Sequence, residues 1–159
     1  IFYPLAYYAA FFSIRASGFS YELMCQGRDK LERNLENYKR NQDKLTKKEQ
    51  DSMRDMRIVQ EMYARGYEFM PIDIYRAQAS RFQVIDGKIM PSLSSIDGLG
   101  DKAAEAVVEA ARQGKFLSEE DFWQRTKVPK SVIDLMSDMG MFGDLPNTNQ
   151  ISLFDFDLE

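Results

Sequence analysis

Two glycines enclose a single leucine in the segment IDGLG, residues 96–100, and an alanine- and valine-rich helix is expected to begin directly after them. Because glycine has no Cβ, Gly98 and Gly100 can adopt unusual backbone angles and leave the amides open to an approaching group. The N-terminus of the helix adds unpaired N–H groups and a partial positive charge, and such groups bind phosphate oxygens. The segment therefore predicts a phosphate-binding turn, with Leu99 pointing inward and Lys102 supplying a charge nearby.

The same segment also suits a plain tight turn between two helices, since Gly-x-Gly often occurs by chance. A second pair of helices is expected downstream, with Lys127 and Lys130 just before its second helix. Paired helix-hairpin-helix units grip the backbone of a duplex without reading its bases, and this contact is electrostatic and sensitive to salt. We therefore predict sequence-independent binding of duplex DNA. The predicted contact residues are Gly98, Leu99, Gly100, Lys102, Lys127 and Lys130.

The inventory of catalytic side chains is short. The chain has no histidine, which removes the commonest general base and the commonest zinc ligand. Its one cysteine, Cys25, is expected to be a small buried thiol. The one Asp-x-Asp segment, residues 155–157, is interpreted as solubilising charge, so no catalytic residue and no metal site is expected. Arg15, Arg76 and Arg81 have two possible roles: they could contact nucleotide or DNA, or they could form surface salt bridges.

Composition bounds the class of protein. With 159 residues, 44% of them hydrophobic, the chain suits one ordinary domain or two small ones. It has no apolar run of about 18 residues and no secretory signal, so we expect no membrane partner and a cytoplasmic protein. No Lys or Arg follows Lys130, whereas six of the 25 acids do, so the preceding part holds 21 positive against 19 negative charges. This mildly basic body is compatible with a polyanionic partner.

Hydrophobic periodicity predicts a mainly α fold with one small β-hairpin. An aromatic helix is expected to begin near Pro4 and, being apolar almost all round, to be buried on several sides. An amphipathic helix follows over residues 28–43. Thr46 and Glu49 form a predicted capping box for a helix that runs to about residue 65, where Gly66 ends it.

The second half of the chain combines the hairpin with short helices. Asp86-Gly87 between apolar residues is typical of a tight two-residue turn that joins two strands. After the glycine turn, Ala and Val recur at helical spacing over residues 103–111. Ser118 is the expected cap of a further helix, and a last helix is expected within residues 129–140.

Apolar residues also crowd the end of the chain, where they come too late to join a core. Beyond Phe142 the composition thins to Pro, Asn, Thr and Asp, which predicts a flexible tail. Ile151, Leu153 and Phe154 nevertheless lie in this tail among polar residues. The residues alone leave two interpretations, a frayed terminus with hydrophobic residues by chance and a segment that stays exposed for a partner.

Several segments together resemble a known family. They are MPIDIYRAQASRFQVIDGKIMPSLSSIDGLGDKAAEAVVEAA, FLSEEDFWQRTKVPKSVIDLMSDMGMFGDLP and NQISLF. They resemble the C-terminal end of the α subunit of bacterial replicative DNA polymerase III, and QISLF near the terminus is similar to the PolC type. The start, YPLAYYAAFFSIRASGF, is similar to the fingers region of that family. The resemblance covers essentially the whole chain and is weakest over residues 26–66.

The resemblance implies three parts. Residues 1–75 are implied to be the end of the polymerase fingers, and residues 76–145 a duplex-binding region with tandem helix-hairpin-helix units. Residues 146–159 are implied to be a flexible tail with a peptide that binds the sliding clamp. In such peptides a glutamine bonds the rim of a pocket and the last apolar pair fills it. The implied clamp-binding residues are Gln150, Ile151, Leu153 and Phe154.

The parent implied by the resemblance is a DNA-directed DNA polymerase, a nucleotidyltransferase that holds Mg²⁺ on aspartates upstream of this chain. This part alone is therefore expected to be inactive. Its implied role is to bind primer–template duplex and to tether the polymerase to the clamp for processive DNA replication, beside upstream polymerase domains. Turns of this kind in similar proteins hold a monovalent cation, which is implied near residues 96–99. Two alternatives stay open, a protein–protein scaffold that uses the fold without DNA and a small standalone nuclease.

Overall fold

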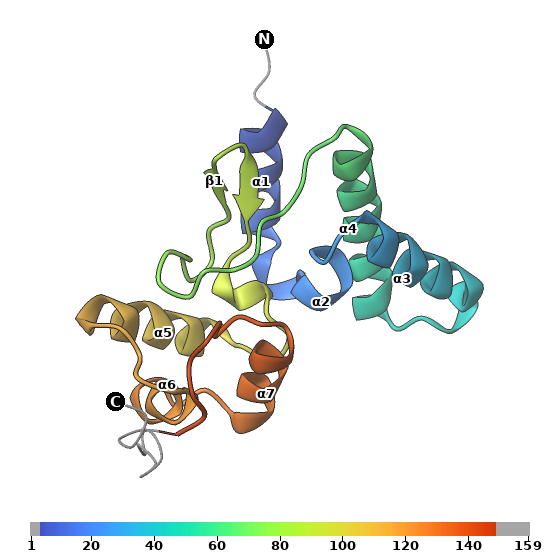
Figure 1. Ribbon diagram of the computed structural model, residues 1–159. Coiled ribbons are helices and arrows are strands. Elements are labelled where there is room, and N and C mark those ends of the chain that lie inside the picture. Colours follow the sequence, from blue (N-terminus) through green and yellow to red (C-terminus); the bar gives the residue numbers. More distant parts are fainter. Residues whose placement is uncertain (1–3, 149–159) are drawn as a thin grey trace.

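The computed structural model describes residues 4–148 as packed helices with a two-stranded antiparallel sheet (Figure 1). The predicted fold class, mainly α with a small β-hairpin, is confirmed. None of the helices formed by these residues is long and apolar enough to cross a membrane. In chain order the helices and strands are α1 Pro4–Ile14, α2 Tyr21–Met24, α3 Arg28–Arg40, α4 Lys47–Ala64, β1 Gln83–Ile85, β2 Lys88–Met90, α5 Asp101–Gln113, α6 Glu119–Thr126 and α7 Lys130–Asp138.

Helix α4 begins and ends where its local sequence predicts. The Glu49 N–H donates to Thr46 Oγ1 and the Thr46 N–H donates to Glu49 Oε1, both at 3.2 Å, which completes the capping box. Gly66 follows the helix with a φ of 88°, a left-handed angle that glycine adopts without strain. Between these ends α4 packs against α3. The buried apolar residues of α4 are Met53, Met56, Val59, Met62 and Tyr63.

Helix α1 is buried on one side only, so the expectation of burial on several sides is wrong for the described residues. Tyr8, Ala9 and Phe12 lie in the core, whereas Tyr7 and Ile14 expose 65% and 83% of their surface. The reason is that the β-hairpin covers one face of the helix (Figure 1), and no part of residues 4–148 covers Tyr7 and Ile14. An apolar helix with a bare face of this kind is suited to contact with another protein surface.

An aromatic cluster joins α1 to the hairpin. The ring centroid of Phe12 lies 4.9 Å from that of Phe19 and 5.7 Å from that of Phe82. Phe69 adds a further buried ring, 5.6 Å from that of Phe12. Aromatic pairs at these distances add stabilisation beyond that of burial. Ser13 Oγ also accepts the N–H of Phe82 at 2.8 Å, so the start of the hairpin is fixed on α1.

The turn predicted from Asp86-Gly87 closes the hairpin. The two φ angles are 51° and 78°, and two positive values are the mark of a type I′ turn, whose twist matches that of paired strands. Strand β2 is bonded on both sides, because Ile89 also accepts the Met70 N–H at 2.8 Å and donates to the Glu68 carbonyl oxygen at 3.1 Å. Ile89 is therefore fully buried, whereas Val84 of β1, on the outer strand, is 45% exposed.

A buried carboxylate ties the end of α1 to α4. A guanidinium nitrogen of Arg15 lies 3.2 Å from Asp55 Oδ1, and the side chains of Arg15 and Asp55 are 37% and 3% exposed. Burial raises the pKa of Asp55 above its ordinary value of 3.8, and the charge of Arg15 opposes that rise. The sequence left Arg15 either a contact with nucleotide or DNA or a salt bridge, and the structure shows the salt bridge.

Replacing Arg15 with alanine is expected to lower the free energy of unfolding by about 1–3 kcal/mol, because Asp55 stays buried without its partner. The folded state holds the Asp55 proton more tightly than the unfolded state, as the raised pKa requires, so protonation relieves the unpaired charge. The destabilisation is therefore expected to shrink as pH falls through the raised pKa.

Urea unfolding of both proteins at neutral pH and at about pH 4.5 measures this difference. Adding Asp55→Asn to Arg15→Ala is expected to restore part of the lost stability at neutral pH. A loss of equal size at both pH values contradicts the role given to Asp55.

Candidate nucleic-acid interface

The first predicted turn lies at the surface, directly before α5. Gly98 has a φ of 85°, and the N–H of buried Leu99 donates to the Ile96 carbonyl oxygen at 3.0 Å. Gly100 is the N-cap of α5, and the Ala104 N–H donates to the Gly100 carbonyl oxygen at 2.9 Å. The amides of the residues between Gly100 and Ala104 have no acceptor inside the helix. The turn therefore presents main-chain donors at the positive end of the helix dipole, with Leu99 pointing inward as expected.

The element that leads into this turn is a single 3-10 turn, η3 Leu93–Ser95, and not a full helix. Serines explain the difference, because their side chains bond locally and compete with helical hydrogen bonds. Ser95 Oγ donates to the Ser92 carbonyl oxygen at 2.6 Å, and the hydroxyl oxygens of Ser92 and Ser94 lie 2.9 Å apart. The first unit is therefore a 3-10 turn, a hairpin turn and a helix.

The second predicted turn, between α6 and α7, repeats the backbone of the first. Lys127 has a φ of 60°, in the left-handed region that Gly98 occupies in the first turn. Val128 is buried, like the leucine of the first turn. Pro129 is then the N-cap of α7, with φ and ψ of −55° and 143°, against −75° and 170° for Gly100. The two turns therefore match position by position.

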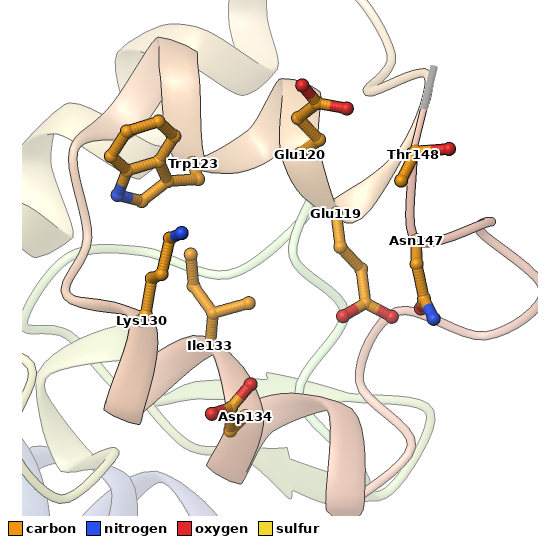
Figure 2. Close-up of a pocket in the computed structure, with 8 residues that line it drawn as sticks. All are labelled: Glu119, Glu120, Trp123, Lys130, Ile133, Asp134, Asn147 and Thr148. Carbon is orange, nitrogen blue, oxygen red and sulfur yellow. The ribbon is translucent and has the colours of Figure 1, made fainter. Parts of the chain in front are cut away.

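Two lysines of the predicted site meet on one aromatic ring. The Nζ atoms of Lys127 and Lys130 each lie 5.1 Å from the centroid of the Trp123 ring, within the range of a cation–π interaction. Figure 2 shows the Lys130 ammonium group beside this ring. Lys102 is exposed in the first turn of α5. Sequence reasoning missed Trp123, although its place four residues before Lys127 on an expected helix was an available signal.

Gly98 is the point where the two units touch. A methyl group at position 98 would come within 3.1 Å of Val132 Cγ2 in α7. Glycine is therefore favoured at this position both by the left-handed φ and by the close approach of α7. Gly100 differs, because its φ is ordinary and a Cβ there would have no atom within 4 Å. Gly98 is thus a packing residue, whereas Gly100 faces open space.

Arg125 joins α6 to the end of α5. Its guanidinium group donates to the carbonyl oxygens of Gly114 at 3.0 Å and Lys115 at 3.1 Å. It also donates to the carbonyl oxygen of Ala110 and lies over the Phe116 ring, with Cζ 4.5 Å from the centroid. The carbonyls of Ala110 and Gly114 lie at the end of α5, where a helix leaves carbonyl oxygens without intrahelical partners. The sequence did not predict these contacts, because main-chain acceptors have no sequence signal.

Two cavities lie beside the turns, and both are partly acidic. One, of about 470 Å³, lies between α6 and α7 and is lined by three carboxylates against one ammonium group (Figure 2). These charged residues are Glu119, Glu120, Asp134 and Lys130. Acidic linings of this kind repel anions. The candidate surface for phosphate is therefore the exposed tips of the turns and not the cavity.

The other cavity, of about 660 Å³, lies behind the first turn. Asp97 lines it, and Ser20 Oγ donates to Asp97 Oδ2 at 2.8 Å, which ties the turn to the start of α2. Burial raises the pKa of Asp97, and the Ser20 hydrogen bond opposes the rise. This side of the turn thus serves to hold the turn on the N-terminal helices.

The remaining predicted residues are placed as follows. Cys25 is buried, as expected, and burial raises the pKa of its thiol. Arg76 and Arg81 are exposed. The predicted clamp-binding residues lie outside the described residues, and they are Gln150, Ile151, Leu153 and Phe154.

Comparison with known proteins gives two findings. A family model described as "Helix-hairpin-helix motif" matches residues 66–151. Over 154 residues, 97% of this chain, the sequence is 36% identical to DNA polymerase III PolC-type of Caldanaerobacter subterraneus subsp. tengcongensis and 34% identical to that of Clostridium perfringens. Over 153 residues, 96% of this chain, it is 38% identical to the protein of the same name from Bacillus cereus. The chain spans 11% of the length of each of these relatives.

Replacing Gly98 with alanine is expected to lower the free energy of unfolding by about 1–2 kcal/mol for the left-handed angle alone. The contact with Val132 adds to this loss. Gly100→Ala is the matched control, and we expect it to stay within about 0.5 kcal/mol of the unchanged protein. Chemical denaturation of the two variants measures both values, and equal effects contradict the separate roles given to the two glycines.

Proposed function

The chain belongs to the helix-hairpin-helix motif family and corresponds to part of a PolC-type DNA polymerase III, and from this premise we propose that it holds duplex DNA by the sugar–phosphate backbone. The observation that carries the proposal is the pair of matched turns, each of which places a helix N-terminus at the surface inside the family match. Contacts to phosphate carry no sequence information. Such a grip suits a polymerase, which must hold duplex of any sequence.

At the first turn, we propose that the amides at the start of α5 donate to a phosphate oxygen. Gly100 supports this, because its backbone is exposed and no side chain covers it. The helix dipole favours an anion at the same place, and exposed Lys102 adds a full charge. At the second turn, Lys127 and Lys130 supply positive charge. We also propose that carbonyls of residues 96–99 hold a monovalent cation.

We further propose that the tail binds the sliding clamp through Gln150, Leu153 and Phe154, with Ile151 between them. Burying Leu and Phe yields roughly 1.5–3 kcal/mol each. Ordering a free tail costs about 1 kcal/mol per residue and offsets much of this gain, so the tail alone is expected to bind weakly. The described chain supports a tether, because the Glu119 N–H donates to the Pro146 carbonyl oxygen at 2.9 Å. The tail therefore leaves from the start of α6, on the same module as both turns, and this linkage would raise its effective concentration at a clamp on the same duplex.

Residues 1–75 are proposed to be the end of the polymerase fingers, in contact with upstream polymerase domains. The bare face of α1, with Tyr7 and Ile14 exposed, supports such a contact. The nucleotidyltransferase chemistry and its Mg²⁺ are proposed to belong to those upstream domains, so that residues 1–159 serve binding and not catalysis. A DNA-replication role places the protein in the cytoplasm.

A protein–protein scaffold remains the second candidate, because the chain has a net charge of −4 and acidic cavities flank the turns. The two functions differ in how salt concentration affects the affinity for duplex DNA. Binding to duplex phosphates weakens steeply with salt, whereas a scaffold has no affinity for duplex DNA even at about 50 mM salt.

Duplex affinity of the chain, measured by fluorescence anisotropy between about 50 and 200 mM salt, is expected to fall linearly on a log–log plot. Lys102→Ala removes one phosphate contact and is expected to reduce the slope of this plot by about 0.9. Lys39→Ala, an exposed charge near the end of α3, is the control and is expected to leave the slope unchanged. An affinity that does not depend on salt overturns the proposed DNA contact.

Clamp binding is tested by replacing Leu153 and Phe154 together with alanine. The expected result is loss of capture by the immobilised clamp, since the apolar pair supplies most of the binding free energy. Duplex affinity of the same variant is the control and is expected to be unchanged. Capture at the level of the unchanged protein rules the tail out as the clamp-binding segment.

A further inference from the structure

We propose that Trp123 positions Lys127 and Lys130 as the phosphate-binding groups of the second turn, so that the two turns grip the backbone by different chemistry. The first turn would bind mainly through main-chain amides, and the second mainly through lysine side chains held at an aromatic ring. This inference rests on the proposed contact with duplex DNA. It adds a positioning residue, Trp123, and a division of roles between the turns.

The difference begins with one N-cap residue. Gly100 and Pro129 occupy the same position in the two matched turns. Proline has no N–H, so the second turn lacks the main-chain donor that glycine provides in the first. The Lys130 and Ser131 N–H groups at the start of α7 remain, so a phosphate at the second turn relies on side-chain donors more than one at the first turn does. Lys127 and Lys130 flank this proline directly in the sequence and provide them.

The backbone of Lys127 supports a role for its charge. Its φ of 60° is a left-handed angle, which costs conformational energy for a residue with a Cβ. Among residues 4–148 the other non-glycine residue with a positive φ is Asp86, at a position of a type I′ turn that favours aspartate. Lysine has no local preference of this kind, and the first turn has glycine at the matched position, Gly98. Strained residues of this type persist only where the surrounding structure holds them, and they cluster at functional sites.

Trp123 controls where the two charges lie. Each Nζ lies 5.1 Å from its ring centroid, and within the described part of the chain neither lysine forms a salt bridge with a carboxylate. A long lysine side chain loses less freedom on binding when its ammonium group is already held at a ring. Glu119 and Asp134 line the cavity that Lys130 and Trp123 also line, and their carboxylates disfavour an anion deep inside it. A phosphate is thereby directed to the two ammonium groups.

Two substitutions at position 127 separate charge from fold. Lys127→Gly and Lys127→Asn both suit the left-handed angle, so both are expected to melt at the same temperature as the unchanged chain or higher. Each is nevertheless expected to reduce the slope of log affinity against log salt by about 0.9, measured by anisotropy with a short duplex. Lys39→Ala removes the same charge from α3 and is expected to change neither slope nor affinity.

Trp123 is the only tryptophan of the chain, so its fluorescence reports the second turn directly. The emission of the unchanged chain is expected to change along the duplex titration, in step with anisotropy. Trp123→Phe keeps an aromatic ring and is expected to retain most of the affinity, whereas Trp123→Leu is expected to lose about threefold or more at about 200 mM salt. If Trp123→Leu does not fold, the variants at position 127 decide alone.

The outcomes separate this inference from the proposed function. If the unchanged chain binds no duplex, both are overturned. If it binds with a steep salt dependence, but Lys127→Gly behaves like Lys39→Ala, the DNA contact stands and the role of the second turn is overturned. If the emission of Trp123 does not change on binding, its positioning role is overturned as well.

Discussion

Burial of one apolar side chain in the middle of each turn is the constraint on which the candidate interface depends. Leu99 and Val128 lie in the core, and the residues on either side of them are thereby held at the surface. Burying such a side chain contributes about 1.5–3 kcal/mol, which is more than any single exposed charge provides. The directions of the amides at the start of α5 and of Lys127 and Lys130 at the second turn therefore follow from core packing. The proposed contact with phosphate thus depends on apolar residues that touch no DNA.

The two turns act as one unit because their helices are fastened to each other. Val132 of α7 packs on Gly98 so closely that a methyl group there would have to displace Val132 by a few tenths of an ångström, and Arg125 bonds carbonyls at the end of α5. The hydrogen bond between Ser20 and Asp97 joins the same unit to the N-terminal helices. The spacing between the two proposed phosphate contacts is thus set by rigid packing. A fixed spacing suits a duplex, whose phosphates also repeat at fixed intervals.

Much of the fold could be predicted from the sequence, because its signals are local. The capping box at Thr46, the type I′ turn at Asp86 and the inward Leu99 all follow from residues next to one another. The bare face of α1 and the contacts of Arg125 could not be predicted in this way. Burial of α1 depends on which distant segments cover it, and Arg125 bonds main-chain atoms of another helix. The clamp-binding residues of the tail rest on resemblance and stay a prediction.

Amide NMR shifts of the chain during titration with a short duplex of arbitrary sequence give the sharpest test of a backbone grip by the two turns. The largest shifts are expected at residues 98–102 and 127–130, with the indole N–H of Trp123 among them, and high salt is expected to reverse all of them together. Shifts confined to α3 and α4, or shifts that persist at high salt, would contradict a backbone grip by the two turns.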